Sequence, residues 1–114
     1  VFDNVHRYAG TLSMRKSAAI LSKANFFIGP DSLLMHIANG LNIPSVIIFG
    51  GSRPVDCFGY PENINLDYTP RCSPCWIHDL HESCNHDIKC MKAISINRVI
   101  DSLECMLKNK LAKI

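Results

Sequence analysis

Polar residues that could bind an anionic ligand follow a short apolar run, residues 26–28, and a Gly-Pro break. They are Asp31, Ser32 and His36, at the start of a segment with helical periodicity. The Ser32 hydroxyl and the unpaired N–H groups of a helix start can donate hydrogen bonds to a phosphate. Because Asp31 repels a phosphate, we expect it to accept from a ligand hydroxyl or to hold a metal ion. The alternative is that Asp31 only caps the helix and that His36 is a partly exposed helix residue.

A second set of candidate residues, Gly50, Gly51 and Arg53, follows the next apolar run, residues 44–49. Glycines let the backbone approach a ligand, and an arginine can bind a phosphate. The alternative is an ordinary turn with a solvated arginine. The aromatic residues of 58–61 could stack on a base or cover the core.

Four cysteines, Cys72, Cys75, Cys84 and Cys90, lie within nineteen residues. A Cys-x-x-Cys turn followed by two further thiols suits Zn²⁺ or iron in a tetrahedral site, which would stabilise a long loop. Reduced thiols without an ion, and a redox pair of Cys72 and Cys75, are the alternatives. Three histidines in the same segment are alternative ligands: His78, His81 and His86.

The periodicity indicates which elements position these residues. We predict a helix over 11–24, strands over 25–29, 44–49 and 63–68, helices over 32–39 and 95–111, and a loop over 71–91. Alternation of strands and helices with short links favours an α/β fold with a parallel sheet. Both candidate sets would then lie at the carboxyl edge of that sheet, where open α/β sheets bind ligands.

Two details of the predicted helices depend on their apolar spacing. After the helix over 32–39, Gly40 is suited to the left-handed position that ends a helix, with Leu41 packing back on Met35. A polar stripe of Ser32, His36 and Asn39 runs opposite the core face of this helix. That core face is Leu33, Leu34, Ile37, Ala38 and Leu41. In the last helix, one broad apolar stripe faces the core: Ile96, Val99, Ile100, Leu103, Met106, Leu107 and Leu111.

The bulk composition excludes several classes of protein. A chain of 114 residues with 47% hydrophobic and 19% charged residues is a globular domain. Its net charge of +2 does not favour a nucleic-acid surface. The longest apolar run is too short to span a bilayer, and the N-terminus lacks a signal-peptide pattern. Because the chain begins with Val1 instead of a methionine, and begins within a sequence pattern, we expect a fragment of a larger protein.

The sequence resembles glycosyltransferase family nine, the ADP-heptose:lipopolysaccharide heptosyltransferases, over nearly its whole length. The core signature is Asp-Ser/Thr-Gly-x-x-His after a strand, followed by a helix and Phe-Gly. The residues that match are Phe27-Ile28-Gly29-Pro30-Asp31-Ser32, His36, Ala38, Pro44, Phe49-Gly50 and Pro54. The helix over 12–24 and the segments 72–91 and 94–99 are also similar to members of the family.

The resemblance implies a Rossmann-like parallel sheet with flanking helices, one half of a two-domain GT-B glycosyltransferase. Residues 1–114 would form the C-terminal domain, which binds a nucleotide-sugar donor such as ADP-heptose, with Mg²⁺ as a further ligand of the diphosphate. The donor-binding residues would be Asp31, Ser32, His36, Gly50, Gly51 and Arg53. The catalytic base is expected in an N-terminal domain, so this chain alone would bind weakly and turn over nothing.

The resemblance also implies a role in lipopolysaccharide or other bacterial surface glycan synthesis. The acceptor would be a glycan or glycolipid, held by the N-terminal domain. The enzyme would act in the cytoplasm, with peripheral attachment to the inner membrane as an option. A different class of function is a non-catalytic α/β binding module stabilised by a metal.

Leu33 departs from the family signature, because the family has a glycine after Asp-Ser. Glycine there permits close approach of a phosphate to the helix start, whereas a leucine side chain blocks it or turns into the core. The predicted core face contains Leu33, which favours the second arrangement.

Overall fold

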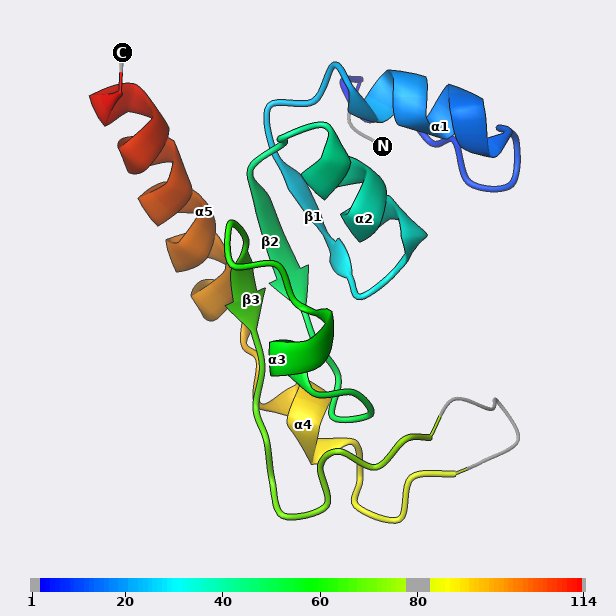
Figure 1. Ribbon diagram of the computed structural model, residues 1–114, viewed down its shortest axis with the longest axis vertical. Coiled ribbons are helices and arrows are strands. Elements are labelled where there is room, and N and C mark those ends of the chain that lie inside the picture. Colours follow the sequence, from blue (N-terminus) through cyan, green and yellow to red (C-terminus); the bar gives the residue numbers. More distant parts are fainter. Residues whose placement is uncertain (1–2, 78–82, 114) are drawn as a thin grey trace.

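The apolar run 44–49 forms the central strand, β2 (Ser45–Ile48), of a three-stranded parallel sheet. The computed structural model describes residues 3–77 and 83–113. Strand β1 (Phe27–Pro30) pairs with one edge of β2, with Ile28 beside Val46, and β3 (Ile64–Leu66) pairs with the other. The predicted strands and their parallel arrangement are confirmed (Figure 1).

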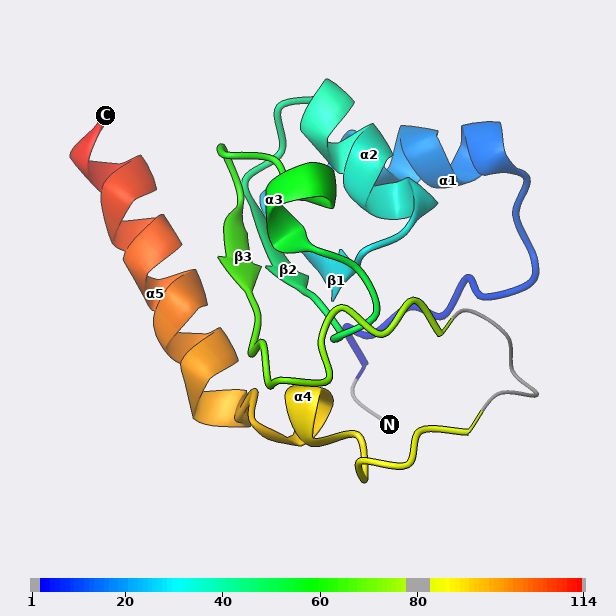
Figure 2. The same cartoon turned by 60° about the horizontal axis from the view of Figure 1, so that its bottom comes forward.

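Side chains of β2 are buried on both faces of the sheet, and each face has its own core. Ile47 and Phe49 pack with Met35 of α2 (Leu33–Gly40) in a cluster that we call the α2-side core. Val46 packs on the other face with Leu66 and with Met106 of α5 (Ile96–Ala112). The sheet is therefore a middle layer between α2 and α5, which cover opposite faces (Figure 2).

Two helices begin directly after a serine that caps them. Helix α1 (Met14–Leu21) begins after Ser13, whose side chain accepts from the N–H of Lys16. Helix α5 begins after Ser95, whose hydroxyl accepts from the N–H of Arg98 at 3.2 Å. Helix α1 packs beside α2 at the margin of the fold (Figure 1).

Two short helices lie in segments where we predicted none. Helix α3 (Val55–Phe58) follows the loop after β2, and α4 (Lys89–Lys92) lies at the end of the predicted cysteine-rich loop. Four-residue helices contain too little periodicity to be recognised in a sequence. Of the helices in the described ranges, none has the length and apolar character that crossing a membrane requires.

The predicted core face of α2 is wrong in part. Ala38 is fully buried as predicted, but so is Met35, which was not assigned to that face, whereas Leu33 is 54% exposed and Leu34 and Leu41 are also exposed. Apolar residues cover most of this eight-residue helix, so the pattern does not define one face, and packing on the sheet selects Met35. The stripe of Ser32, His36 and Asn39 consequently borders the buried face instead of lying opposite to it.

The predicted end of α2 and the predicted apolar stripe of α5 also need correction. Asn42, with φ +57°, takes the left-handed conformation that we assigned to Gly40, because the chain turns two residues later than expected. On α5, Val99, Leu103 and Met106 pack on the sheet. Four members of the predicted stripe are exposed, because a narrow sheet contacts only one side of the helix: Ile96, Ile100, Leu107 and Leu111.

Buried and exposed positions of the sheet predict different costs for the loss of one methylene group. Replacing Ile47→Val removes it from a fully buried site, which we expect to lower the free energy of unfolding by about 0.5–1.5 kcal/mol. The matched change Ile28→Val, at a side chain that is 46% exposed, should cost about 0.5 kcal/mol or less. Denaturant unfolding measures both, and equal losses would contradict this assignment of the core.

Candidate active site at the carboxyl edge of the sheet

The loops after β1 and β2 meet at the carboxyl edge of the sheet, as predicted. Nη1 of Arg53 lies 3.7 Å from Oδ2 of Asp31, which joins the two loops by an ion pair. The Asp31 side chain is 14% exposed and the Arg53 side chain 41%. An exposed pair of this kind contributes about 1 kcal/mol or less, so the sheet, and not the pair, sets the loop positions.

Asp31 does not cap α2. The residue at the N-cap is Ser32, and its side chain makes no capping hydrogen bond. The Asp31 carboxylate is directed to Arg53 instead. The interpretation of Asp31 as no more than a helix cap is therefore wrong, and both Asp31 and Ser32 remain candidates for ligand binding.

The Arg53 guanidinium lies over an aromatic surface. Its Cζ atom is 5.1 Å from the centroid of the Phe58 ring. Phe58 in turn meets Trp76 edge-on, with ring centroids 6.3 Å apart. Stacking on Phe58 and pairing with Asp31 orient Arg53 while leaving several of its five N–H donors for an anion.

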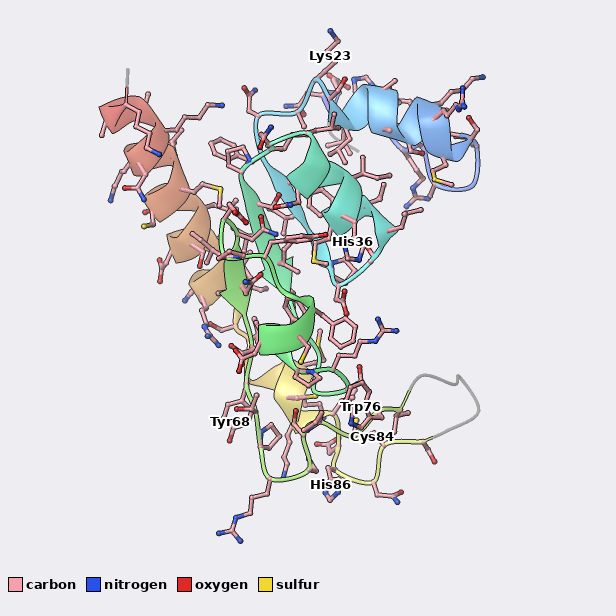
Figure 3. All side chains as sticks on the ribbon, in the orientation of Figure 1. Lys23, His36, Tyr68, Trp76, Cys84 and His86 are labelled. Carbon is pink, nitrogen blue, oxygen red and sulfur yellow. The ribbon has the colours of Figure 1, made fainter. Side chains whose placement is uncertain are left out.

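His36 meets a residue that the sequence did not connect with it. Its Nδ1 atom is 2.8 Å from the Tyr60 hydroxyl, and the two rings meet edge-on at 82°. Tyr60 follows α3 and also packs against the α2-side core, which confirms that this aromatic segment covers the core. No short-range spacing could reveal a contact across 24 residues. Figure 3 shows His36 on α2, on the side nearer the carboxyl edge of the sheet.

The cysteine-rich segment covers the loop of Gly50 and Gly51. The Gly51 carbonyl accepts hydrogen bonds from the Ser73 hydroxyl at 2.8 Å and from the N–H of Cys75 at 3.1 Å. A Cβ atom at Gly51 would lie 3.1 Å from Cβ and Sγ of Cys90. Cys90 therefore occupies the space that the missing side chain of Gly51 leaves open. Gly50 is half-buried and lies beside Met91.

The structure does not assemble the predicted metal site. The six cysteines are free thiols. Within 3–77 and 83–113, no group of three or more His, Cys, Asp or Glu side chains is placed to hold a metal ion. Cys72, Cys75, Cys84 and Cys90 therefore stay a predicted ligand set. Two alternative ligands, His78 and His81, lie outside the described residues.

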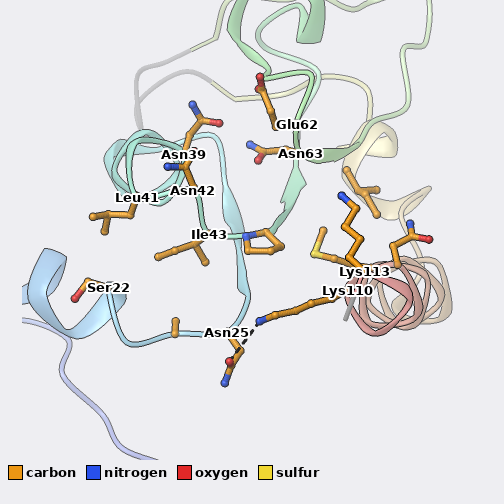
Figure 4. A pocket seen from close by; sticks show the side chains of 15 residues that line it. Ser22, Asn25, Asn39, Leu41, Asn42, Ile43, Glu62, Asn63, Lys110 and Lys113 are labelled. Atoms are coloured by element: carbon orange, nitrogen blue, oxygen red, sulfur yellow. Dashed lines mark hydrogen bonds between the residues drawn. The ribbon is translucent and has the colours of Figure 1, made fainter.

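A cavity of about 710 Å³ lies at the opposite, amino edge of the sheet. Its lining comes from the segments that precede the strands and from the end of α5, and it includes none of the predicted donor-binding residues. In this lining, Nζ of Lys110 donates a hydrogen bond to Oδ1 of Asn25 at 3.5 Å (Figure 4). This cavity is separate from the site built by Asp31, Arg53 and His36.

Comparison with protein families identifies the family of the chain. The family model of glycosyltransferase family 9 (heptosyltransferase) matches residues 4–86, most of the chain. The chain belongs to glycosyltransferase family 9. Its role is accordingly that of a glycosyltransferase domain. The match spans β1, α2 and β2, and with them all the candidate donor-binding residues, but it ends before Cys90 and α5. Neither curated proteins nor solved structures gave a match.

The packing at Gly51 in this family 9 domain can be tested with a second glycine as control. We expect Gly51→Ala to lower the free energy of unfolding by about 1–3 kcal/mol, because the new methyl group crowds Cys90. Gly40→Ala meets no atom within 4 Å and lies at the end of a helix, so it should stabilise the fold by about 0.5–1 kcal/mol. A stabilising Gly51→Ala, measured by thermal or denaturant unfolding, would contradict the covered loop.

The four-cysteine ligand set predicts about one Zn²⁺ or iron ion per chain in protein purified under reducing conditions. Cys75→Ser should lose most of that metal, because the Cys-x-x-Cys turn supplies two of the four thiolates. Cys57→Ser is the matched control, since Cys57 is exposed on α3 and should leave the metal content unchanged. Elemental analysis measures the metal content per chain of the wild type and both variants. A wild-type protein without metal would contradict the prediction.

Proposed function

We propose that the carboxyl edge of β1 and β2 binds the diphosphate of a nucleotide sugar, which is the donor in glycosyl transfer. The observation that carries the proposal is the contact between Asp31 and Arg53, because it joins the loops after β1 and β2, which the parallel strand order brings to one edge. Ser32 and His36 add a hydroxyl and an imidazole on the adjoining helix. The donor that we propose is ADP-heptose or a similar nucleotide sugar.

The chemistry requires positive charge and hydrogen-bond donors at the diphosphate. In the transfer, an acceptor hydroxyl attacks the anomeric carbon, the bond from that carbon to the diphosphate breaks, and the nucleoside diphosphate leaves with the electron pair. Negative charge therefore grows on a phosphate oxygen as the bond breaks. Arg53 can stabilise this charge through its guanidinium N–H groups, which are oriented before the ligand arrives.

Leu33 changes how a phosphate can approach the start of α2. Its side chain is exposed, not buried in the core, and it stands where the family signature has a glycine. An exposed leucine side chain at the first position of the helix leaves a phosphate less room than a glycine would. We infer that the side chains of Arg53, Ser32 and His36 bind the diphosphate more than the helix N-terminus does.

Asp31 has a different role from Arg53 in this scheme. Its carboxylate would accept from a sugar hydroxyl or from a donor-bound Mg²⁺, for which oxygen is the preferred ligand. The contact with Arg53 lowers the repulsion between Asp31 and the diphosphate, because the two side-chain charges offset each other.

The remainder of the reaction is assigned to other parts of a GT-B enzyme. We propose that an N-terminal domain supplies the base and holds the acceptor, a glycan or glycolipid of the bacterial surface such as lipopolysaccharide, in the cytoplasm or at the inner membrane. This chain would then bind donor weakly and not turn over by itself, because positioning of two substrates supplies much of the rate.

The proposal is tested by titrating the chain with ADP, UDP and GDP, each with and without Mg²⁺, by NMR or calorimetry. We expect one nucleotide to bind saturably, with shifts at Ser32, His36 and Gly50. Arg53→Gln should weaken that binding about three- to tenfold, because a partly exposed charge-assisted contact to phosphate is lost.

The control is Arg15→Gln, which removes an exposed arginine on α1 and should leave the affinity unchanged. Equal losses from both substitutions would indicate a general charge effect and contradict a diphosphate site at Arg53. Binding by none of the three nucleotides, in this chain and in a longer protein that includes the preceding domain, would overturn the proposed function.

A further inference from the structure

Tyr60 lies in the loop between α3 and β3, and both this loop and the sheet hold it in place. The Tyr60 carbonyl accepts a hydrogen bond from the N–H of Asn63 at 3.1 Å and another from Nδ2 of Asn65 at 2.9 Å. Asn65 is the middle residue of β3. The half-buried Tyr60 ring packs against the α2-side core. Backbone and ring are therefore both fixed, so the hydroxyl group lies at a defined point beside α2.

The bond from Tyr60 to His36 has a favoured direction. A phenol hydroxyl can donate or accept, and a neutral imidazole has one N–H donor and one acceptor nitrogen. A phenol O–H is more acidic than the N–H of a neutral imidazole, so Tyr60 is the better donor and Nδ1 the better acceptor. With Nδ1 accepting, the imidazole proton lies on Nε2.

The Nε2 atom of His36 faces away from Tyr60, because the two ring nitrogens lie on different sides of the imidazole. His36 is exposed, and within the described residues the Tyr60 hydroxyl is its hydrogen-bond partner. In the imidazolium form Nε2 also carries a proton. An Nε2–H donor is thus present in both charge states, as an anionic ligand requires.

We propose that Tyr60 is a positioning residue that holds His36 in one orientation with its proton on Nε2. The oriented Nε2–H group then donates to a phosphate oxygen of the ligand at the carboxyl edge. This donation to a ligand rests on the proposed function. The position of the proton on the His36 ring in the ligand-free protein does not.

The state of the ring is measured by NMR of ¹⁵N-labelled histidine, at a pH well above the ordinary histidine pKa of about 6.5. The two nitrogens of a neutral imidazole differ widely in chemical shift according to which one carries the proton. We expect His36 to show the Nε2–H form alone in the wild type and a mixture of both forms in Tyr60→Phe, which keeps the ring and removes only the hydroxyl.

Tyr68→Phe is the matched control, because Tyr68 is 48% exposed and follows β3 (Figure 3). It should leave the His36 signals unchanged. A wild-type His36 with its proton on Nδ1, or a Tyr60→Phe spectrum equal to that of the wild type, would overturn the proposal whether or not any nucleotide binds.

The ligand step is measured by a double-mutant cycle with whichever of ADP, UDP and GDP the wild type binds. Loss of one hydrogen bond that orients a donor should weaken binding about two- to tenfold in Tyr60→Phe. In the His36→Ala background, Tyr60→Phe should cause no further loss, because the residue through which it acts is gone. An equal loss in both backgrounds would show that Tyr60 acts by packing and would overturn this step.

The two failures are distinguishable. If the wild type binds no nucleoside diphosphate in the chain or in a longer protein, the proposed function fails, and the ¹⁵N spectra still decide how Tyr60 holds His36. If nucleotide binds but the His36 signals do not depend on Tyr60, the proposed function stands and the positioning role is overturned.

Discussion

Burial of β2 on both faces is the constraint on which the rest of the structure depends. Val46, Ile47 and Phe49 are almost completely removed from water. Each such side chain contributes about 1.5–3 kcal/mol, more than any exposed ion pair in the molecule. A strand buried on both sides needs a helix on each face and a partner strand on each edge, and α2, α5, β1 and β3 supply them. The parallel order then brings the ends of β1 and β2 to one edge.

That edge combines a charged pair with a loop that is already covered. Arg53 is oriented by Asp31 and Phe58 and keeps donors free, whereas Gly51 is buried against Cys90. The candidate residues therefore differ in what they could offer a ligand. Arg53, Ser32 and His36 present side chains, and the glycine loop serves mainly to seat the cysteine-rich segment. The cysteines thus contribute to the site through packing, with or without a metal ion.

Much of this arrangement could be predicted from the sequence. The continuous apolar run 44–49 predicted a strand that is buried on both faces of the sheet. The Gly-Pro break after 26–28 predicted the end of a strand and the start of a helix. Helices were predicted over 11–24 and 95–111, and their observed starts depend on Ser13 and Ser95, each of which caps through the residue three positions later. The signature from Asp31 to His36 indicated the family, which the match over residues 4–86 confirmed. Each of these signals is local in the chain.

Other features were decided only by tertiary packing. The side of α2 that is buried depends on contact with the sheet, since apolar residues surround the helix, and so Leu33 is exposed while Met35 is buried. The orientation of α2 that buries Met35 also brings His36 to Tyr60, 24 residues away. The sequence by itself determined the order of the three strands and the three longer helices, and the residue types at the carboxyl edge, because spacing and capping act over a few residues. Which side chains meet there was set by packing between distant segments, which no local pattern contains.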